Sequence, residues 1–569
     1  MTPDDTTQSG VWFVELNQVD IKTELWVAQV TKKYELLSTI TQPFKNKMVE
    51  FSYKTLAESW WVTAIWFSGD GNLYQINLAT KALSLLSTSF TTLGTYANTP
   101  TYSDIAFFQG RLFFPNSVNT LNSLRVWTSG QGTGVNSDGV STTVSINHLL
   151  ISWVSFDDID KSLEGGILVA RLAGTNYTRN IISVDNTAQT MELDSILPAW
   201  DYTAYAYNLS IWVVKNSSGT NIWIDTLRRQ TSYRPMKEHN SKLFVWDGDM
   251  VYSLDSTCTL WKTTNWDQAI SVGSDYVVKQ IESDWNYLYI LADNFQSHYI
   301  NTAGSDFYVR SAKSKLYIWD WVSEWFSKIV DVGSHCFCIK EVDNVLYALL
   351  SPETNDGVLL TYFNGSDFPT VQRIRKQDAS TDVLQKPLAF VNSLDYDRGK
   401  FYIALNGIEN GVETQTLYVL STYASEANGL YKEKEVSGTQ IRWVDILRTG
   451  INPLILYYTS TGIYYRGTSM ENTGYIITKI YDFTKYQYGE LVKGVQLQFK
   501  ETLPAGSLVR IYWKWDEESS FSSLFANITA SNQNQILFGI MKRYRKLQLK
   551  VELQWVTAWS PKLTWIYIY

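Results

Sequence analysis

Three residues of the types that bind metal ions stand close together in the sequence Ser-His-Cys-Phe-Cys: His335, Cys336 and Cys338. Zinc takes four such ligands in a tetrahedral arrangement. Successive side chains of a β-strand point to opposite faces, so Cys336 and Cys338 would share a face while His335 points away. The three residues would not close easily on one ion. The pattern favours small buried core residues over a metal site.

Candidates for acid–base chemistry are few. Asp157, Asp158 and Asp160 could supply the two carboxylates of a glycosidase, but the sequence does not give their separation in space. A solvated acidic loop is the other interpretation, and the sequence favours it. The remaining histidines are isolated, which favours surface or hydrogen-bonded structural positions; they are His148, His239 and His298.

Two glycine-containing segments come near to functional motifs without matching them. Residues 68–74, Ser-Gly-Asp-Gly-Asn-Leu-Tyr, place their glycine one residue early for the Ser-x-Asp-x-Gly-x-x-Trp turn of sialidase blades and end in Tyr, so hairpin chemistry explains them equally well. Residues 130–134, Gly-Gln-Gly-Thr-Gly, lack the strand and helix that phosphate binding requires. The sequence thus predicts no catalytic, cofactor-binding or metal-binding residue, no cofactor and no enzymatic activity.

One basic cluster stands out near the end of the chain, in residues 541–550. It contains Lys542, Arg543, Arg545, Lys546 and Lys550. A solvated strand edge is one interpretation of this cluster. Docking against an acidic neighbouring subunit is the sharper one.

The whole chain is acidic and rich in aromatic residues. It has 569 residues, a net charge of −8 and 15% aromatic residues, an excess that favours strands. The negative net charge argues against nucleic acid as the main ligand, because the overall field of the protein would not gather the many phosphate contacts of a duplex-binding surface. Three cysteines are too few to stabilise a chain of this length by disulfide bonds. The polar, acidic first residues and the lack of eighteen consecutive apolar residues predict a soluble protein that is not conventionally secreted.

Aromatic and branched residues recur in short strands that come in couples. In residues 313–325, Leu316 and Ile318 would face one side and Tyr317 and Trp319 the other, so this strand needs cover on both faces. The sequence gives eight couples: 11–13 with 25–27, 64–66 with 73–76, 112–114 with 124–127, 243–246 with 251–254, 288–290 with 316–319, 346–349 with 358–362, 401–405 with 417–420, and 454–458 with 463–465.

Successive couples are roughly 40 to 65 residues apart, with one step about twice as long, and a unit of this size with doubly covered antiparallel strands is typical of a β-propeller blade. We therefore predict an all-β chain that forms a β-propeller of seven or eight blades, with aromatic residues filling the wedges between blades. An array of β-sandwiches with chance spacing is the alternative.

Two segments depart from the propeller pattern. Residues 128–145 are rich in Gly, Ser and Thr and predict a flexible link into a small β-rich insert with strands at 166–172, 180–184, 190–193 and 210–215. After residue 472 apolar and polar residues alternate cleanly, as in 547–553, which predicts a separate antiparallel sandwich. The predicted division is propeller, first part, 1–139; insert, 140–230; propeller, second part, 231–471; and C-terminal β-sandwich, 472–569.

In its order of parts the sequence resembles the nozzle or hub propeller proteins of tailed bacteriophage tails. The resemblance covers the propeller strands, the insert around Ala-Arg-Leu-Ala-Gly-Thr-Asn and the end of the chain, including Arg-Lys-Leu-Gln-Leu-Lys. It implies a structural component of the virion tail that is made in the host bacterial cytoplasm. It also implies a closed ring of copies that extends the DNA channel, takes part in DNA ejection and host attachment, and has no membrane-spanning segment.

The partners implied by this resemblance are further copies in the ring, other tail proteins such as the adaptor and fibres, and passing DNA without sequence-specific contact. An acidic channel wall would let DNA slide. The alternative is a carbohydrate-binding or glycan-cleaving propeller that acts as a host-surface adhesin, because aromatic faces also stack on sugars. A cellular scaffold propeller would show regular Gly-His and Trp-Asp repeats, and the Trp-Asp pairs that begin at Trp246 and Trp319 are too few for such a repeat.

Overall fold

The structure, a computed structural model, is built from β-strands. It describes residues 13–17, 19–20, 29–39, 49–54, 60–67, 73–77, 81, 83–87, 102–103, 106–108, 111–116, 123–147, 167–172, 175–185, 188–212, 214–215, 221–222, 233–247, 250–254, 270–294, 298–300, 306–308, 313–351, 357–374, 376–378, 383–385, 389–409, 412–421, 429–448, 453–459, 461–478, 481–482, 490–503, 507–515, 518, 520–529, 534–554 and 562–568. Every regular element among them is a strand, which confirms the predicted all-β class. In this part of the chain no helix has the length and apolar character that crossing a membrane requires.

Most strands belong to antiparallel groups that follow one another along the chain. Five groups are separate four-stranded sheets: β5 (Val49–Lys54), β6 (Trp60–Phe67), β7 (Leu73–Asn77) and β8 (Leu83–Ser87); β21 (Met236–His239), β22 (Lys242–Asp247), β23 (Met250–Leu254) and β24 (Ile270–Ser271); β25 (Tyr276–Ser283), β26 (Leu288–Asn294), β29 (Ser314–Trp319) and β30 (Lys328–Asp331); β31 (His335–Val342), β32 (Val345–Ser351), β33 (Val358–Tyr362) and β34 (Thr370–Ile374); and β41 (Ile441–Leu447), β42 (Leu454–Thr459), β43 (Gly462–Met470) and β4 (Lys32–Thr39).

Two more groups have the same consecutive order inside larger sheets. They are β10 (Ala106–Phe108), β11 (Arg111–Asn116) and β12 (Ser123–Ser137), and β37 (Leu394–Asp397), β38 (Lys400–Glu409), β39 (Val412–Ser421) and β40 (Gly429–Ser437). Short two-stranded pairs complete this part of the chain: β2 (Val19–Asp20) with β3 (Gln29–Val30), β9 (Tyr102–Ser103) with β20 (Tyr233–Arg234), β18 (Val214–Lys215) with β19 (Asn221–Ile222), β27 (His298–Ile300) with β28 (Asp306–Tyr308), and β35 (Lys376–Asp378) with β36 (Val383–Gln385).

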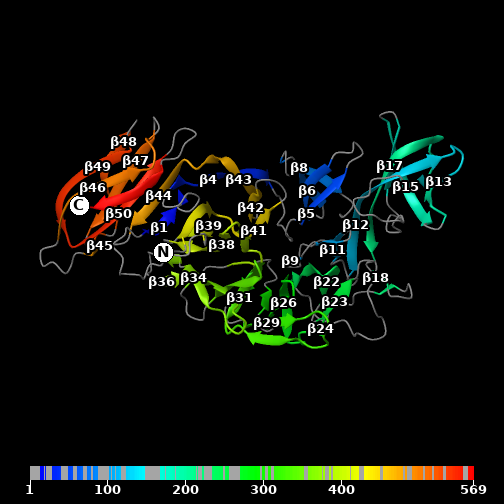
Figure 1. Ribbon diagram of the computed structural model, residues 1–569, viewed down its shortest axis with the longest axis horizontal. Coiled ribbons are helices and arrows are strands. Elements are labelled where there is room, and N and C mark those ends of the chain that lie inside the picture. Colours follow the sequence, from blue (N-terminus) through cyan, green and yellow to red (C-terminus); the bar gives the residue numbers. More distant parts are fainter. Residues whose placement is uncertain are drawn as a thin grey trace.

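The groups surround a common centre (Figure 1). The first strand of each group contacts the first strand of the next, in the order β5, β10, β21, β25, β31, β37 and β41. Unpaired strands of different sheets approach one another only where the sheets converge, so the first strands lie innermost. The fold is therefore β-propeller-like.

The circle closes through a strand from near the start of the chain. β4 pairs with β43 at the outer edge of the last group, although the two strands lie at opposite ends of the sequence. A shared apolar cluster then joins this group to the first one, because Ile76 of β7 packs with Trp443 and Leu456. The N-terminal part of the chain thus holds the two ends of the circle together.

Seven of the eight predicted couples pair antiparallel as expected, for example Trp66 with Tyr74 and Val245 with Tyr252. The first couple differs. Phe13 begins β1 (Phe13–Asn17), which pairs with β40 and with β44 (Thr473–Thr478). The predicted partner, residues 25–27, lies outside the described residues. The hydrogen bonds of β1 come from distant segments, and a local pattern does not reveal them.

The strand within residues 313–325 is covered on both faces, as predicted. Leu316 and Ile318 belong to an apolar cluster shared with β31 and β32. Tyr317 and Trp319 belong to a second cluster shared with β22 and β23. Leu316, the least exposed of the four, has no exposed surface, and none exceeds 6%. Aromatic side chains do fill the spaces between neighbouring sheets here.

The insert is continuous with the propeller-like part through one long strand. β12 pairs with β11 near its start, with β13 (Thr143–Asn147) near its end, and along most of its length with β17 (Trp200–Trp212). The strands β14 (Ile167–Leu172), β15 (Thr175–Asp185) and β16 (Thr190–Leu193) complete the sheet. The predicted flexible link at 128–145 is therefore wrong for residues up to 137, because β17 satisfies their backbone hydrogen bonds. The glycine-rich part coincides with a register shift between Thr128 and Gln131.

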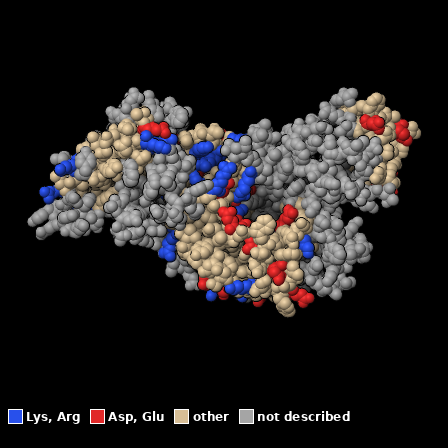
Figure 2. Space-filling model, in the orientation of Figure 1, with Lys and Arg blue, Asp and Glu red and all other residues tan. Residues whose placement is uncertain are grey.

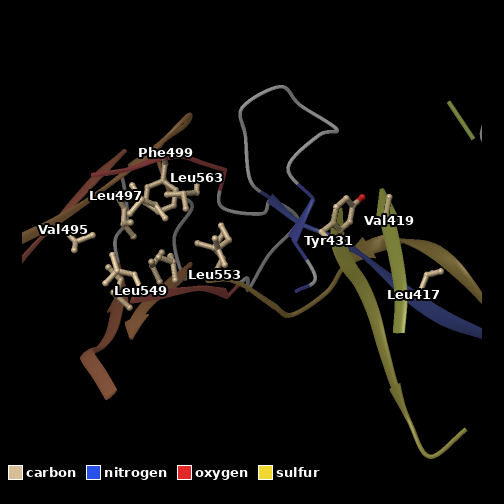
Figure 3. Packing of buried hydrophobic residues seen from close by; sticks show 14 of the residues in the cluster. Leu417, Val419, Tyr431, Val495, Leu497, Phe499, Leu549, Leu553 and Leu563 are labelled. Carbon is tan, nitrogen blue, oxygen red and sulfur yellow. The ribbon is translucent and has the colours of Figure 1, made fainter. Parts of the chain in front are cut away.

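The C-terminal part has two facing sheets, as the alternation predicts. One contains β46 (Glu490–Phe499), β49 (Gln535–Tyr544) and β51 (Leu563–Ile568), and the other contains β44, β45 (Tyr481–Asp482), β47 (Leu508–Trp515), β48 (Ser522–Thr529) and β50 (Lys546–Gln554). Figure 3 shows Val495, Leu497 and Phe499 facing Leu549 and Leu553 across the core. The second sheet continues through β1 into β40, so this part shares a sheet and a core with the propeller-like part.

Candidate functional site

Two loops meet at one rim of the circle. Leu288 pairs with Trp319, so the segments 284–287 and 320–327, which follow β25 and β29, lie side by side. Trp321 in the second segment packs against His239 of the preceding group, with 5.9 Å between ring centroids. We call this surface the aromatic rim and define it by Trp285, Tyr287, Trp321, Val322 and Trp325.

Large apolar side chains of the aromatic rim are open to solvent. Trp285 is 85% exposed, Trp325 78% and Val322 71%. A tryptophan that packs in a protein removes about 150–250 Å² from water. These two tryptophans, almost fully exposed on adjoining segments, gain free energy when a flat apolar ligand face covers them. The prediction that aromatic residues fill the wedges between blades is wrong for Trp325, because its side chain is exposed to solvent.

Aspartates order both segments of the aromatic rim. Asp284 Oδ1 accepts hydrogen bonds from the backbone N–H groups of Asn286 and Tyr287, each at 2.7 Å, and Tyr289 donates to its Oδ2 at 2.6 Å. Such turns hold the loop without help from the side chains beyond them. Trp285 is thus presented outward by an ordered turn.

The second segment is ordered in the same way. Asp320 accepts hydrogen bonds from the N–H and hydroxyl groups of Ser323, at 2.8 and 2.5 Å. The hydroxyl bond, which outweighs the opposing effect of burial, lowers the pKa of Asp320 and keeps its carboxylate charged. Trp321 has a positive φ of 54°, a conformation that is uncommon for a bulky residue. Contacts of its ring with His239 and with Lys242, whose Nζ lies 5.7 Å from the ring centroid, stabilise this strained backbone conformation.

Ion pairs connect the first strands near the centre of the circle. Lys237 Nζ on β21 lies 2.7 Å from Glu282 Oε2 on β25. Asp395 of β37 binds Lys340 of β31 at 2.9 Å and Arg448, just after β41, at 3.1 Å. Figure 2 shows charged side chains of both signs around a hollow near the middle of the molecule. The described carboxylates here are paired with cations, so their first role is to join neighbouring sheets.

His335 belongs to a buried polar cluster between two sheets. Lys279 Nζ lies 2.8 Å from Asp293 Oδ2 and 2.9 Å from His335 Nε2, and it donates to the carbonyl of Cys336 at 2.8 Å. Ser314 completes the cluster by donating to Asp293 and accepting from the Cys336 N–H group. The cluster joins β25, β26 and β29 to β31. His335 is therefore hydrogen-bonded to protein groups on its Nε2.

The two neighbouring cysteines lie on opposite faces of their sheet, which corrects the predicted common face. β31 has a register shift between Cys336 and Cys338. The extra residue of this bulge reverses the alternation of side chains, so the two cysteines point to opposite faces. Cys336 packs toward the preceding sheet and Cys338 toward the following one. Burial raises the pKa of the Cys338 thiol to about 12. Within the described residues no group of three or more His, Cys, Asp or Glu side chains is placed to hold a metal ion.

Several predicted candidates lie outside the described residues. These are Asp157, Asp158, Asp160, His148, the turn at 68–72 and the side chain of His298. His239 is described, and it differs from the prediction because its surroundings are rings: Phe244 lies at 6.4 Å and Trp321 at 5.9 Å. Burial lowers the pKa of His239. Residues 130–134 form part of strand β12.

The basic cluster spans a strand edge and a turn. Arg543 lies on β49, an edge strand of its sheet, and Arg545 follows it in the turn to β50; both are exposed. Lys550 is already engaged, since its Nζ lies 4.0 Å from the centroid of the Tyr475 ring. Only part of the predicted cluster therefore forms an edge.

Sequence reasoning missed the aromatic rim. Its signal is an aspartate followed within one to five residues by tryptophans, as in Ser-Asp-Trp-Asn-Tyr and Asp-Trp-Val-Ser-Glu-Trp. The aspartate closes a turn on its own backbone, and this turn places the following side chains beyond the sheet. The hydrophobic pattern alone groups Trp325 with the buried residues of the same run.

Comparisons with known proteins find matches in structure alone. No family model and no curated protein matches the chain. An exo-β-1,3-galactanase from Phanerochaete chrysosporium shares 10% identity and a TM-score of 0.25, covering 63% of this chain and 98% of its own. A family 43 arabinoxylan arabinofuranohydrolase from Bacillus subtilis shares 9% identity, a TM-score of 0.21, and coverage of 72% and 96%. Sqt1 from Saccharomyces cerevisiae shares 8% identity, a TM-score of 0.32, and coverage of 77% and 97%.

These matches bear on one prediction directly. The prediction that the protein is not an enzyme is contradicted, because glycoside hydrolases are among the matching structures, and it is withdrawn. With TM-scores below 0.5, the matches carry no argument about substrate or catalytic residues. None of the three proteins named here is a phage tail protein, so the resemblance to the nozzle type stays a prediction.

Proposed function

We propose that this protein is a carbohydrate-recognising β-propeller and that the aromatic rim binds the sugar. The observation that carries the proposal is the pair Trp285 and Trp325, which are 85% and 78% exposed on two adjoining segments. The apolar C–H face of a pyranose ring covers an indole face while its hydroxyl groups stay in water. Exposed tryptophans on ordered turns suit this ligand.

The aromatic rim is rigid enough to bind without a large ordering penalty. Asp284 and Asp320 fix the two turns through backbone hydrogen bonds. Trp319 Nε1 also donates to the Ser323 carbonyl at 2.8 Å, which ties the second segment to the buried strand β29. A preorganised surface loses little conformational entropy on binding. The exposed Asn286 and Glu324 lie beside the tryptophans in sequence and would supply polar contacts to sugar hydroxyl groups.

A glycan array followed by calorimetry tests this proposal. We expect selective binding of a glycan class by the whole chain. Trp285→Ala and Trp325→Ala should each weaken that binding by about tenfold or more, as expected for an aromatic anchor. Leu36→Ala is a matched control, because Leu36 is an exposed apolar residue, 53% open, on β4. Absence of selective binding, or equal binding by both tryptophan variants and the control, would refute the proposal.

The same experiment addresses cleavage. Glycoside hydrolysis needs two carboxyl groups about 5 Å apart for retention or about 6.5–9.5 Å apart for inversion. Asp395 and Glu282, near the centre, are held by cations in the structure. To test for cleavage, each glycan that binds is also incubated with the protein and analysed for released sugar. Release would make the protein a glycan-cleaving propeller, and binding without release would make it an adhesin.

For the architecture, we propose a propeller of seven blades divided by an insert and followed by a C-terminal β-sandwich. Support comes from the contacts between first strands and from the pairing of β4 with β43. The proposed divisions are 1–139, 140–230, 231–471 and 472–569, and the core of the insert includes Val135, just before its proposed start. A high-resolution map of the isolated protein would count the blades directly.

A second candidate function is a structural component of a bacteriophage tail that forms a ring and carries other tail parts. The observation that favours it is the exposed apolar surface at both ends of the molecule, including Trp200 in the insert and Leu537 in the terminal part, at 57% and 62%. Such residues anchor protein interfaces. Partners would be further copies, adaptor and fibre proteins, and passing DNA. Detection of the protein in purified virions, by mass spectrometry and by microscopy of rings, tests this role.

A further inference from the structure

The far end of the insert exposes several large apolar side chains. Four exposed apolar side chains lie in this part of the insert: Val140 is 79% exposed, Trp200 57%, Ile182 55% and Ile196 45%. We call them the insert tip. Trp200 pairs with Ser137 at the end of β12, immediately before the turn that contains Val140, so these two residues lie together.

Hydrogen bonds fix the loop that carries Ile196. Its carbonyl accepts from Arg179 Nη2 at 2.9 Å, and the Ser137 hydroxyl donates to the carbonyl of Leu197, also at 2.9 Å. Leu197 itself is fully buried. Ile196 and Trp200 are thus exposed on an ordered loop.

The charge around the insert tip is negative. Asp138 and Asp194 lie in turns next to the apolar side chains and Asp201 lies at the start of β17, and all three residues are exposed. Arg179 is the described cation nearest in sequence to the loop, and its guanidinium is directed to the Ile196 carbonyl. On the face that Figure 2 shows, the charged side chains of the described residues at this end of the molecule are Asp and Glu.

The opposite end presents an apolar surface with positive charge. The outer face of the sheet β49–β46–β51 exposes Leu537 by 62%, Tyr567 by 46% and Leu491 by 40%. Gln496 pairs with Leu537 on one side and with Tyr567 on the other, so these side chains form a row across the sheet. Leu491 pairs with Arg543 in a second row. We call this surface the sandwich face.

The described charged side chains of the sandwich face are cations. Arg543 stands opposite Leu491, and Lys493 is exposed on the same strand two residues further on. The buried residues of these strands, such as Val495 and Phe538, fill the core behind them. The sandwich face is therefore the outer side of a stable sheet.

The insert tip and the sandwich face complement each other in charge, and each is apolar. Figure 1 places the insert, with β13, β15 and β17, at one end of the longest axis and β46, β49 and β50 at the other. The two surfaces of one chain are therefore far apart and cannot cover each other. We propose that the insert tip of one copy docks on the sandwich face of a second copy. This contact goes beyond carbohydrate recognition, and for the tail role it names the surfaces of the ring.

A contact between two different surfaces is heterologous, so it propagates from copy to copy and closes only if the rotation allows it. The charges speed and select the encounter, while the apolar side chains supply most of the affinity. The contact should weaken in high salt because its charged groups remain near solvent.

Light scattering coupled to size exclusion tests the contact with two variants. One variant disrupts the insert tip with the substitutions Trp200→Ser and Asp201→Lys. The other disrupts the sandwich face with Leu537→Ser and Arg543→Glu. The unaltered chain should assemble well beyond its 65.2 kDa mass. Each variant alone should be a monomer, with its dissociation constant raised by about tenfold or more.

An equimolar mixture of the two variants is the decisive sample. Each variant keeps the surface that the other lacks, so the mixture should form a dimer of one copy of each and nothing larger. That dimer also shows that both variants are folded. Leu36→Ser is the matched control and should assemble like the unaltered chain. A second pair, Ile196→Ser with Leu491→Ser, repeats the test at other positions so that misfolding of one variant does not decide it.

The proposal is overturned if the unaltered chain is monomeric at all concentrations, if either variant assembles alone like the unaltered chain, or if mixtures of both pairs stay monomeric. Glycan binding by the same variants should be unchanged, because the aromatic rim is untouched. Presence in virions is measured separately. Failure of this contact is therefore distinguishable from failure of either proposed function.

Discussion

Lys279 and Asp293 form an ion pair, with 2.8 Å between Nζ and Oδ2, in which the side chains are 1% and 0% exposed. They lie on β25 and β26 of one sheet, and Lys279 also donates to the carbonyl of Cys336 in the next sheet. A buried charge is tolerated only when partners replace its lost hydration. Ser314 also donates to Asp293, and His335 Nε2 lies 3.2 Å from its Oδ2. The pair therefore fixes how two neighbouring sheets are joined.

Removal of one member of this pair should destabilise the protein strongly. We expect Asp293→Ala to lower the free energy of unfolding by about 3–5 kcal/mol, because it leaves a buried ammonium group without its counter-ion. The double variant Lys279→Met with Asp293→Leu should lose clearly less than the sum of the two single variants. Urea unfolding followed by tryptophan fluorescence measures both. A loss below about 1 kcal/mol for Asp293→Ala would contradict this account.

Local sequence patterns were sufficient to predict which adjacent strands pair. They were not sufficient to predict which side chains are exposed to solvent. Trp319 and Trp325 stand six residues apart in one aromatic run, yet Trp319 is 4% exposed and Trp325 78%. The difference arises from the turn headed by Asp320 and from the neighbouring sheet, and neither follows from periodicity. The pairing of β1 with β40 and β44 was equally hidden, since these strands are distant in sequence. The bulge at Cys336 likewise reverses a face that strict alternation assigns.

Acid should weaken the contact between β21 and the aromatic rim. Burial, together with Lys237, lowers the pKa of His239, although Asp284 opposes them. The unfolded chain, with an ordinary histidine pKa of about 6.5, therefore takes up the proton first as the pH falls. The stability that neutral His239 contributes is complete above about pH 6.5 and is lost below it.

The variant His239→Phe isolates this effect. Phenylalanine keeps a ring beside Phe244 and Trp321 and cannot titrate. Between pH 7 and pH 5 the melting temperature of the unaltered chain should fall more steeply than that of the variant. Parallel curves would show that His239 does not titrate differently in the folded and unfolded states.

Gly139 should be essential to the insert. Its φ is +75°, and a β-carbon there would lie 2.8 Å from the Ala199 β-carbon. Gly139→Ala combines backbone strain with a steric clash, and we expect it to cost about 2–4 kcal/mol locally. Gly333→Ala is the matched control, because Gly333 has a φ of +72° with nothing near the added carbon. It should cost about 1 kcal/mol.

Hydrogen exchange separates the two glycine variants by place. Gly139→Ala should lower amide protection in residues 135–147 and 175–202 and leave residues 313–351 unchanged. Gly333→Ala should show a small loss of amide protection confined to residues 313–351. Equal effects of the two substitutions would mean that the contact between Gly139 and Ala199 is not tight.

The strand that closes the circle is held by a buried carboxylate. Tyr34 of β4 donates to Glu433 Oε1 on β40 at 3.2 Å, and Arg466 Nε of β43 lies 2.7 Å from the same oxygen. Burial, and then the negative charge of Glu433, raises the pKa of Tyr34, so its hydroxyl stays protonated and continues to donate. We expect Tyr34→Phe to lower the free energy of unfolding by about 1 kcal/mol. Glu433→Gln should cost more, because Arg466 then loses its buried counter-ion. A double-mutant cycle of Tyr34→Phe and Glu433→Gln should give a coupling of about 0.5–2 kcal/mol, whereas a coupling near zero would show that this hydrogen bond does not hold the closing strand.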